Sequence, residues 1–157
     1  MTPLYGWAEK SERVNDYVPD VRFERTSIIS TLCENGFEAP MTFEGTLNKD
    51  LFEIYIRDCL VPTLKSGDIV VMDNSSVHKA RGVLQPIYDI GATVLFLPAY
   101  SPDLNPIEMA WSKMKIMLKK LKARTSKELE HALLIALKYI NKNDILNYFS
   151  HDGYLCI

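Results

Sequence analysis

Two carboxylates in this sequence stand where they could act together on one ligand. Asp73 directly follows the apolar run 69–72, at the end of a predicted strand, and open α/β sheets bind ligands at the carboxyl ends of their strands. Glu108 follows after 34 intervening residues, in the first turn of a predicted long helix. That separation accommodates one helix and one strand, a crossover that returns the chain to the same end of a sheet. The sequence therefore predicts that the two carboxylates converge.

Each carboxylate also has an ordinary structural explanation. An aspartate after a strand is a common turn or helix-capping residue. Glu108 follows Asn105 and Pro106, so it would occupy the third position of a helix whose N-cap is Asn105. A carboxylate there can close a capping box and meet the positive end of the helix dipole. Considered one at a time, Asp73 and Glu108 could each have a purely structural role.

The strands that must position these residues are predicted from short apolar and β-branched runs. Segments 26–32 and 39–43 flank an Asn35-Gly36 turn, a spacing typical of an antiparallel hairpin. The continuous apolar runs 69–72 and 93–97 predict strands buried on both faces, as in the parallel part of a sheet.

Helices are predicted between and after these strands. Apolar residues at helical spacing from Asn48 indicate an amphipathic helix that ends near Pro62. A second helix is predicted from about 77 to 90, weakened at Pro86, and a long one from 106 to about 121. A capping box at 125–128 opens a further helix. The order of elements predicts a three-layer α/β domain with four strands.

Length and composition agree with one globular domain. The chain has 157 residues, of which 47% are hydrophobic and 24% charged, which excludes a disordered chain, a collagen-like fibre and a disulfide-stapled miniprotein. No run approaches the roughly 18 apolar residues of a membrane span, and the N-terminus lacks the pattern of a signal peptide. We therefore expect a cytoplasmic protein with no membrane partner. The three cysteines form no C-x-x-C pair, so a zinc knuckle is not expected.

The distribution of charge indicates a possible phosphate-binding surface. The net charge of −2 argues against a polycation that coats DNA. Between Met109 and Lys127, however, no acidic residue occurs, and seven of the 18 basic residues lie there: Lys113, Lys115, Lys119, Lys120, Lys122, Arg124 and Lys127. Such a stretch is a candidate DNA-backbone contact. The alternative is a solvated helix face.

Two segments around the carboxylates resemble a known family. Residues 71–79, VMDNSSVHK, and 97–108, LPAYSPDLNPIE, are followed by Trp111 and Lys115. They resemble the catalytic core of Tc/mariner-superfamily transposases, in the bacterial insertion-sequence branch with a DDE nuclease domain. In that family the first motif supplies the second acidic residue and the longer motif supplies the third. The resemblance extends from about Tyr5 to about Leu121.

The resemblance implies an RNase H-like fold and phosphoryl transfer with two Mg²⁺ or Mn²⁺ ions. Asp73 and Glu108 would be two of three carboxylates that hold them, since Mg²⁺ prefers oxygen ligands. In such transposases, water cuts at the element's ends and the released 3′-hydroxyl attacks target DNA, so the expected partners are transposon ends and target DNA. The chain would form a single DDE endonuclease domain, 1–157, with a core at about 5–121 and a helical extension at 125–150.

Neighbouring residues receive supporting roles from the same resemblance. Asn74 would orient Asp73 or a metal-bound water, and alternatively it caps the next helix. His78 would contact a phosphate or the leaving group, and alternatively it is a surface histidine. Trp111 is expected to pack beneath the site rather than stack on a base.

The family's first aspartate has no counterpart that we can assign. In relatives it ends a strand that opens the domain and pairs with the strand expected here at 26–32. Glu9, Asp16, Asp20 and Glu24 are available, but none ends an apolar strand. We therefore expect a partial domain, truncated before its first strand. Two hypotheses follow: a fragment of a transposase catalytic domain, or a non-catalytic DNA-binding or dimerising remnant. Since an unpaired strand edge can pair with another chain, a homodimer is a possible partner arrangement.

Overall fold

The computed structural model describes residues 9–10 and 26–154. Strands β1 (Thr26–Cys33) and β2 (Gly36–Glu44) form the expected antiparallel hairpin. Its register shifts between Ile29 and Thr31, where Ser30 on β1 faces both Ala39 and Pro40 on β2. Pro40 has no N–H to donate to the ladder, and the Ser30 hydroxyl donates instead to the Glu38 carbonyl at 2.6 Å. The hairpin thus contains a β-bulge.

The two apolar runs form the parallel pair β3 (Ile69–Met72) and β4 (Thr93–Phe96). Within the described residues, β3 pairs only with β4 and β1 only with β2. The prediction of one four-stranded mixed sheet is therefore not met there: two separate two-stranded sheets are present. The physical reason is that no described strand bridges the hairpin and the parallel pair.

The prediction that β3 and β4 are buried on both faces is wrong. Val70 and Met72 are buried, but Ile69 is 66% exposed and Leu95 54% exposed. Alternate residues of a strand point to opposite faces. One face of this sheet packs on a hydrophobic cluster that includes Phe52, and the other face remains open to solvent.

The helix that contributes Phe52 changes its winding along its length. It begins as α1 (Lys49–Ile54), where the Asn48 side chain accepts the Leu51 N–H. It continues as a π-helical segment, Tyr55–Leu60, and ends in a 3₁₀ turn, Val61–Thr63. The predicted end near Pro62 is confirmed.

The helix expected at about 77–90 is much shorter than predicted. Only α2 (Gln85–Asp89) forms, with Pro86 in its first turn, and residues before it make turns. Gly82 has a φ of 82°, outside the right-handed helical region. The ring of Pro86 would also clash with the carbonyl four residues earlier, so the helix can begin at the proline but not run through it.

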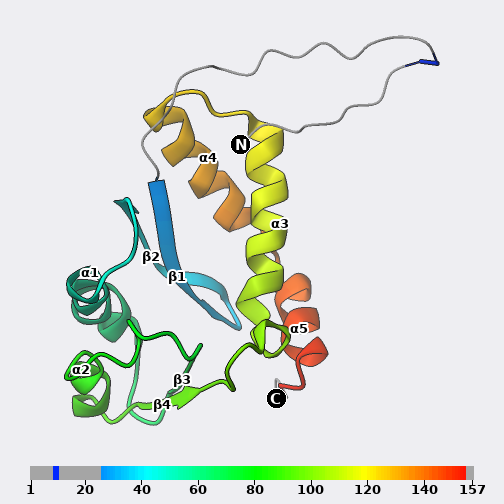
Figure 1. Cartoon of the computed structure of the whole chain (residues 1–157). Coiled ribbons are helices and arrows are strands. Elements are labelled where there is room, and N and C mark those ends of the chain that lie inside the picture. The colour runs from blue at the N-terminus through cyan, green and yellow to red at the C-terminus, as the bar shows by residue number, and fades with distance from the viewer. Residues whose placement is uncertain (1–8, 11–25, 155–157) are drawn as a thin grey trace.

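The remaining helices lie on the other side of the hairpin (Figure 1). They are α3 (Pro106–Leu121), α4 (Ser126–Tyr139) and α5 (Lys142–His151). Ile29 of β1 packs on the first hydrophobic cluster, whereas Ile28 and Leu32 pack on a second cluster built from α3, α4 and α5. The hairpin therefore separates two helical groups, which matches the layered arrangement expected.

The second cluster also accounts for Trp111. Its ring lies 4.7 Å from the ring of Phe37 on β2, so Trp111 packs α3 against the hairpin. Its expected place beneath the carboxylate site stays a prediction. In the part of the chain that the structure describes, no helix combines the length and the apolar character needed to cross a membrane.

Candidate active site

Asp73 leaves the sheet at the edge from which the chain also runs toward α3. It directly follows β3, and its side chain is 60% exposed. The Leu97 N–H donates to the Met72 carbonyl at 2.8 Å, so the ends of β3 and β4 lie side by side. The segment 98–105, which leads from β4 to Glu108, starts at the same edge. No hydrogen bond or ion pair joins Asp73 to Glu108.

One oxygen of the Asp73 carboxylate is held by its own loop. Asp73 Oδ1 accepts the Ser75 N–H at 3.0 Å and lies 2.6 Å from His78 Nδ1. The contact with His78 is short, but its angles are not those of a hydrogen bond. No described residue contacts Oδ2 by a hydrogen bond or ion pair, so this oxygen can bind a ligand.

His78 is not a surface residue. Its side chain is only 18% exposed, and its ring lies 4.5 Å from the ring of buried Phe52. It therefore stands between the hydrophobic cluster and Asp73, where it can fix the orientation of the carboxylate. The expected contact with a phosphate or leaving group stays a prediction.

Asn74 lies beside Asp73 and is exposed. The alternative that it caps a following helix is not met, because residues 76–79 form a turn and α2 starts only at Gln85. Its side chain makes no hydrogen bond with the described residues. A role beside Asp73 remains a prediction.

Glu108 does not make the capping contact that its position predicts. Asn105 is the N-cap of α3, yet its side chain makes no capping hydrogen bond. Glu108 contributes its backbone N–H to the Asn105 carbonyl at 3.0 Å, while its exposed carboxylate accepts nothing from any described residue. Asn105 has a ψ of 98°, and Pro106 offers no N–H.

The next two helices begin with the same arrangement and do close the box. Glu128 Oε2 accepts the Arg124 and Thr125 N–H groups at 2.6 and 3.2 Å, and Asp144 accepts the Asn141 N–H at 3.0 Å. Their N-cap residues Thr125 and Asn141 have ψ values of 161° and 168°. Of three acidic residues at the third helical position, only Glu108 is left for a ligand. The capping-box explanation for Glu108 is therefore removed, and only its position near the positive end of the helix dipole remains as a structural explanation.

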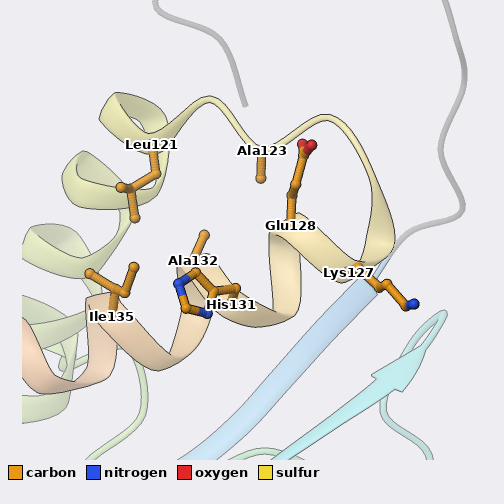
Figure 2. A pocket seen from close by; sticks show the side chains of 7 residues that line it. All are labelled: Leu121, Ala123, Lys127, Glu128, His131, Ala132 and Ile135. Carbon is orange, nitrogen blue, oxygen red and sulfur yellow. The ribbon is translucent and has the colours of Figure 1, made fainter.

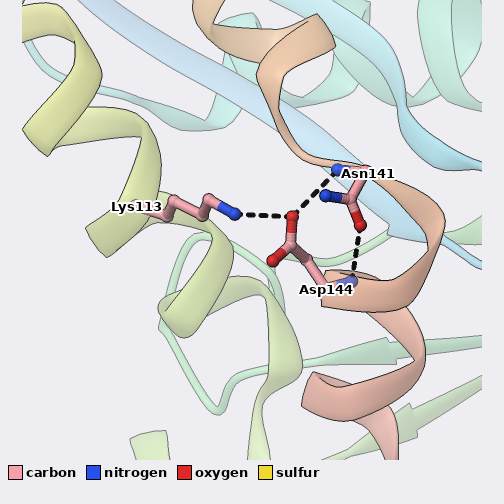
Figure 3. A network of polar contacts seen from close by, with 3 residues as sticks. All are labelled: Lys113, Asn141 and Asp144. Atoms are coloured by element: carbon pink, nitrogen blue, oxygen red, sulfur yellow. Dashed lines mark hydrogen bonds and ion pairs between the residues drawn. The ribbon is translucent and has the colours of Figure 1, made fainter.

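The basic residues of α3 divide between two environments. Lys113 Nζ forms an ion pair with Asp144 Oδ2 at 2.6 Å (Figure 3). It also lies 5.1 Å from the Tyr139 ring. The hydrogen bond with Asp144 raises the pKa of Lys113. This lysine connects α3 to α5. Its ammonium group is therefore already paired with Asp144, which competes with its predicted role in DNA binding.

Other basic residues extend the helix face that carries Glu108. Ser112, Lys115 and Lys119 follow Glu108 at intervals of three or four residues, which places them on one side of the helix, and all are exposed. Lys122 ends α3 in the left-handed conformation, with a φ of 48°. Lys120, Arg124 and Lys127 are exposed as well.

The two carboxylates are the type of ligand that a hard divalent cation prefers, but two are fewer than the three carboxylates expected. Asp73 and Glu108 offer exposed carboxylate oxygens, the ligands that Mg²⁺ and Mn²⁺ prefer. Among residues 9–10 and 26–154, no group of three or more acidic, histidine or cysteine side chains is arranged to hold a metal ion. Asp16, Asp20 and Glu24 lie outside the described residues, as does the Tyr5 region of the resemblance; Glu9 is exposed.

A pocket of about 370 Å³ lies elsewhere, between the end of α3 and the start of α4 (Figure 2). At a rise of about 1.5 Å per residue, its residue Leu121 is roughly 20 Å along the helix from Glu108. The lining is mainly apolar, and the Glu128 carboxylate in it is engaged in capping. The pocket is therefore not part of the carboxylate site.

Known proteins show what this arrangement is similar to. The chain resembles a protein chain in the crystal structure of the Mos1 strand transfer complex, with a TM-score of 0.65 and 17% identity. The match covers 98% of this chain and 50% of that one, so this chain spans half of its length. The likeness is one of fold, the mixed α/β fold of an RNase H-like catalytic domain. No curated protein matches the sequence.

A family model agrees with the two motifs. The model described as DDE superfamily endonuclease matches residues 1–130, which include both Asp73 and Glu108. The chain therefore belongs to the DDE superfamily endonuclease family.

Proposed function

We propose that this chain carries part of the catalytic site of a transposase that cleaves DNA strands and transfers them to target DNA with divalent metal ions. The observation that carries the proposal is Glu108. Its carboxylate stands exposed at the start of α3 and makes no capping contact, although the equivalent residues of α4 and α5 do.

In this proposal Asp73 and Glu108 hold the metal ions. Divalent ions bound there would supply positive charge to the attacking and leaving oxygens. Ser75 and His78 contact Asp73 Oδ1 and leave Oδ2 available for a metal ion. DNA as substrate is supported by the Mos1 structure, which is a strand transfer complex.

The DNA backbone would run along the face of α3 that begins with Glu108. Lys115 and Lys119 are one turn apart on that face and exposed, so their ammonium groups can neutralise successive phosphates. Lys113 is engaged with Asp144 and contributes less. Transposon ends and target DNA share this backbone chemistry.

A second candidate function is a non-catalytic DNA-binding or dimerising module. It is favoured by the two-carboxylate donor set of the described residues and by the exposed apolar face around Ile69 and Leu95. Such a module would retain DNA binding but would not cut.

Metal binding and strand cleavage separate the two functions. Mn²⁺ affinity is measured by titration, and nicking of supercoiled plasmid is followed with Mg²⁺ or Mn²⁺, for the wild type, Asp73→Asn and Glu108→Gln. Asp103→Asn, an exposed carboxylate in the turn before α3, is the control. Metal-dependent nicking that is lost in the first two variants and kept in the control supports catalysis. Binding of Mn²⁺ and DNA without nicking supports the second function, and no loss of Mn²⁺ affinity in either variant contradicts the proposed site.

The DNA path has its own matched test. Removing both charges in Lys115→Gln/Lys119→Gln should reduce the slope of log affinity against log salt by about 0.7–0.9 for each phosphate that is no longer neutralised. Lys120→Gln/Lys127→Gln removes the same charge from exposed positions off this face and should change the slope little. Equal effects of the two pairs would mean that charge alone, and not the Glu108 face, guides the DNA.

A further inference from the structure

The C-terminal segment contacts the chain on both sides of Glu108. The Tyr154 hydroxyl donates to the Leu104 carbonyl at 2.9 Å, four residues before Glu108. On the other side, Lys113 pairs with Asp144 of α5 at 2.6 Å, five residues after it. Helix α5 accordingly lies beside the N-terminal end of α3 (Figure 1). The segment 141–154 spans the part of the chain that presents the carboxylate.

Residues 141–154 are stabilised by contacts of their own. A capping box joins Asn141 and Asp144 at the start of α5 (Figure 3), and Ile145 is buried in the second hydrophobic cluster. After the helix, the Tyr154 N–H donates to the Phe149 carbonyl at 2.8 Å, and the two rings meet edge to face at 5.8 Å. Both ends of the segment are therefore anchored independently of Glu108.

The turn before α3 needs an external support. Its N-cap side chain makes no hydrogen bond, and its 3₁₀ turn, Pro102–Leu104, is exposed. The Leu104 and Asn105 N–H groups make only local bonds, to Ser101 and Pro102 at 3.2 and 3.1 Å. Among the described residues, the bond from Tyr154 is the one side-chain hydrogen bond that ties this turn to a distant part of the chain.

The Tyr154 hydroxyl is protonated near neutral pH, as the ordinary tyrosine pKa of about 10 already requires. The ring is half-buried, and its burial raises the pKa of the phenol above its ordinary value, with the nearby Asp152 carboxylate acting in the same direction. A protonated phenol near neutral pH has one O–H, which the Leu104 carbonyl accepts. The contact is therefore present under ordinary conditions.

We propose that residues 141–154 act as a strut that fixes Glu108, and that Tyr154 is a positioning residue for its carboxylate. This inference rests on the proposed function, in which Glu108 binds a metal ion. It does not follow from the family match, because that match ends at residue 130.

The first test measures the turn itself and needs no metal. Tyr154→Phe in the full chain removes the hydroxyl but keeps the ring beside Phe149. Amide hydrogen exchange at Leu104 and Asn105 should accelerate about two- to tenfold, the factor expected when one hydrogen bond is removed, with exchange in the α3 core unchanged. Tyr148→Phe is the matched control, since it removes a hydroxyl of α5 that bonds no described residue. Unchanged exchange at Leu104 and Asn105 would overturn the strut.

The second test connects the strut to Glu108. In Tyr154→Phe, Mn²⁺ affinity should fall by about tenfold, the lower end for residues that support metal ligands, and in Tyr148→Phe it should not change. Introduced into Glu108→Gln, the Tyr154 change should cause no further loss, because it acts through Glu108. A full additional loss in that background would overturn the positioning role. If wild-type protein binds no Mn²⁺ at all, the proposed function fails while the exchange measurement still decides the strut.

Discussion

Glu108 and Glu128 offer a matched comparison between a carboxylate kept for a ligand and one that stabilises a helix. Both occupy the third position of a helix, after Asn105 and Thr125 respectively. The perturbation is alanine substitution at each position, Glu108→Ala and Glu128→Ala. Changes in helix propensity and in the interaction with the helix dipole are nearly the same in the two variants, so they cancel in the difference.

What does not cancel is the capping contact. Glu128 accepts two backbone N–H groups at 2.6 and 3.2 Å, and Glu108 accepts none. With a net contribution of about 0.5–1.5 kcal/mol per hydrogen bond, at an exposed site, Glu128→Ala should cost about 1–2 kcal/mol more than Glu108→Ala. For a chain of this size that corresponds to a melting temperature lower by about 2–8 °C.

The assay is urea unfolding followed by circular dichroism, with and without Mn²⁺. Without metal, Glu108→Ala should remain close to the wild type. A bound ligand stabilises the native state by about 2.7 kcal/mol at 100 times its dissociation constant, so Mn²⁺ should stabilise the wild type and Glu128→Ala but not Glu108→Ala.

The reasoning would be refuted by equal costs of the two substitutions without metal. That result would mean that Glu108 caps α3 in solution and that its position needs no functional explanation. Mn²⁺ stabilisation that persists in Glu108→Ala would separately show that the ion binds elsewhere.

Three further outcomes follow from the contacts around the site and the core. His78→Gln should lower Mn²⁺ affinity by about 10–100-fold, because it removes the ring that supports Asp73; unchanged affinity in a metal titration would contradict that support. Burial raises the pKa of Tyr55 to about 12, so its contribution to stability is complete below pH 10 and lost as the pH rises toward 12, and alkaline unfolding of Tyr55→Phe should lack this step. Lys113 lowers the pKa of Asp144, so the ion pair stabilises the fold above the ordinary carboxylate pKa near 4, and this stabilisation is lost as the pH falls below it. In Lys113→Met, the free energy of unfolding should therefore depend less on pH between 6 and 3. An unchanged pH dependence would speak against the ion pair.

Much of the fold was predictable because its signals are local. The hairpin, both parallel strands, α3 and the capping box at Thr125 are confirmed, with element bounds that agree to within three residues. Each depends on neighbours in the sequence: β-branched runs, a proline at a helix start, or a side chain that bonds the backbone three residues away. Two long motifs also pointed to a DDE nuclease, and the family model confirms membership of the DDE superfamily endonucleases.

Other predictions failed, one because of residues inside the predicted helix itself and the rest because distant residues decide the outcome. The helix expected at 77–90 shrank to α2 because Gly82 and Pro86 outweigh apolar spacing. Apolar content alone could not tell that Ile69 and Leu95 would face solvent, since burial depends on which elements cover a sheet. The expected single sheet failed for the same reason, because strand pairing also depends on elements that are distant in the sequence.

The sequence by itself determined which carboxylates could be functional. Strand ends and helix starts depend on the types of neighbouring residues, so they can be located from the sequence. Only the tertiary structure decided what each one does. Glu108, Glu128 and Asp144 occupy the same local position, yet Glu128 and Asp144 cap their helices and Glu108 makes no capping contact. The difference lies in backbone angles at the helix start, and at Glu108 the turn that sets them is held by Tyr154, 46 residues further along the chain. Such long-range contacts form only when the chain folds.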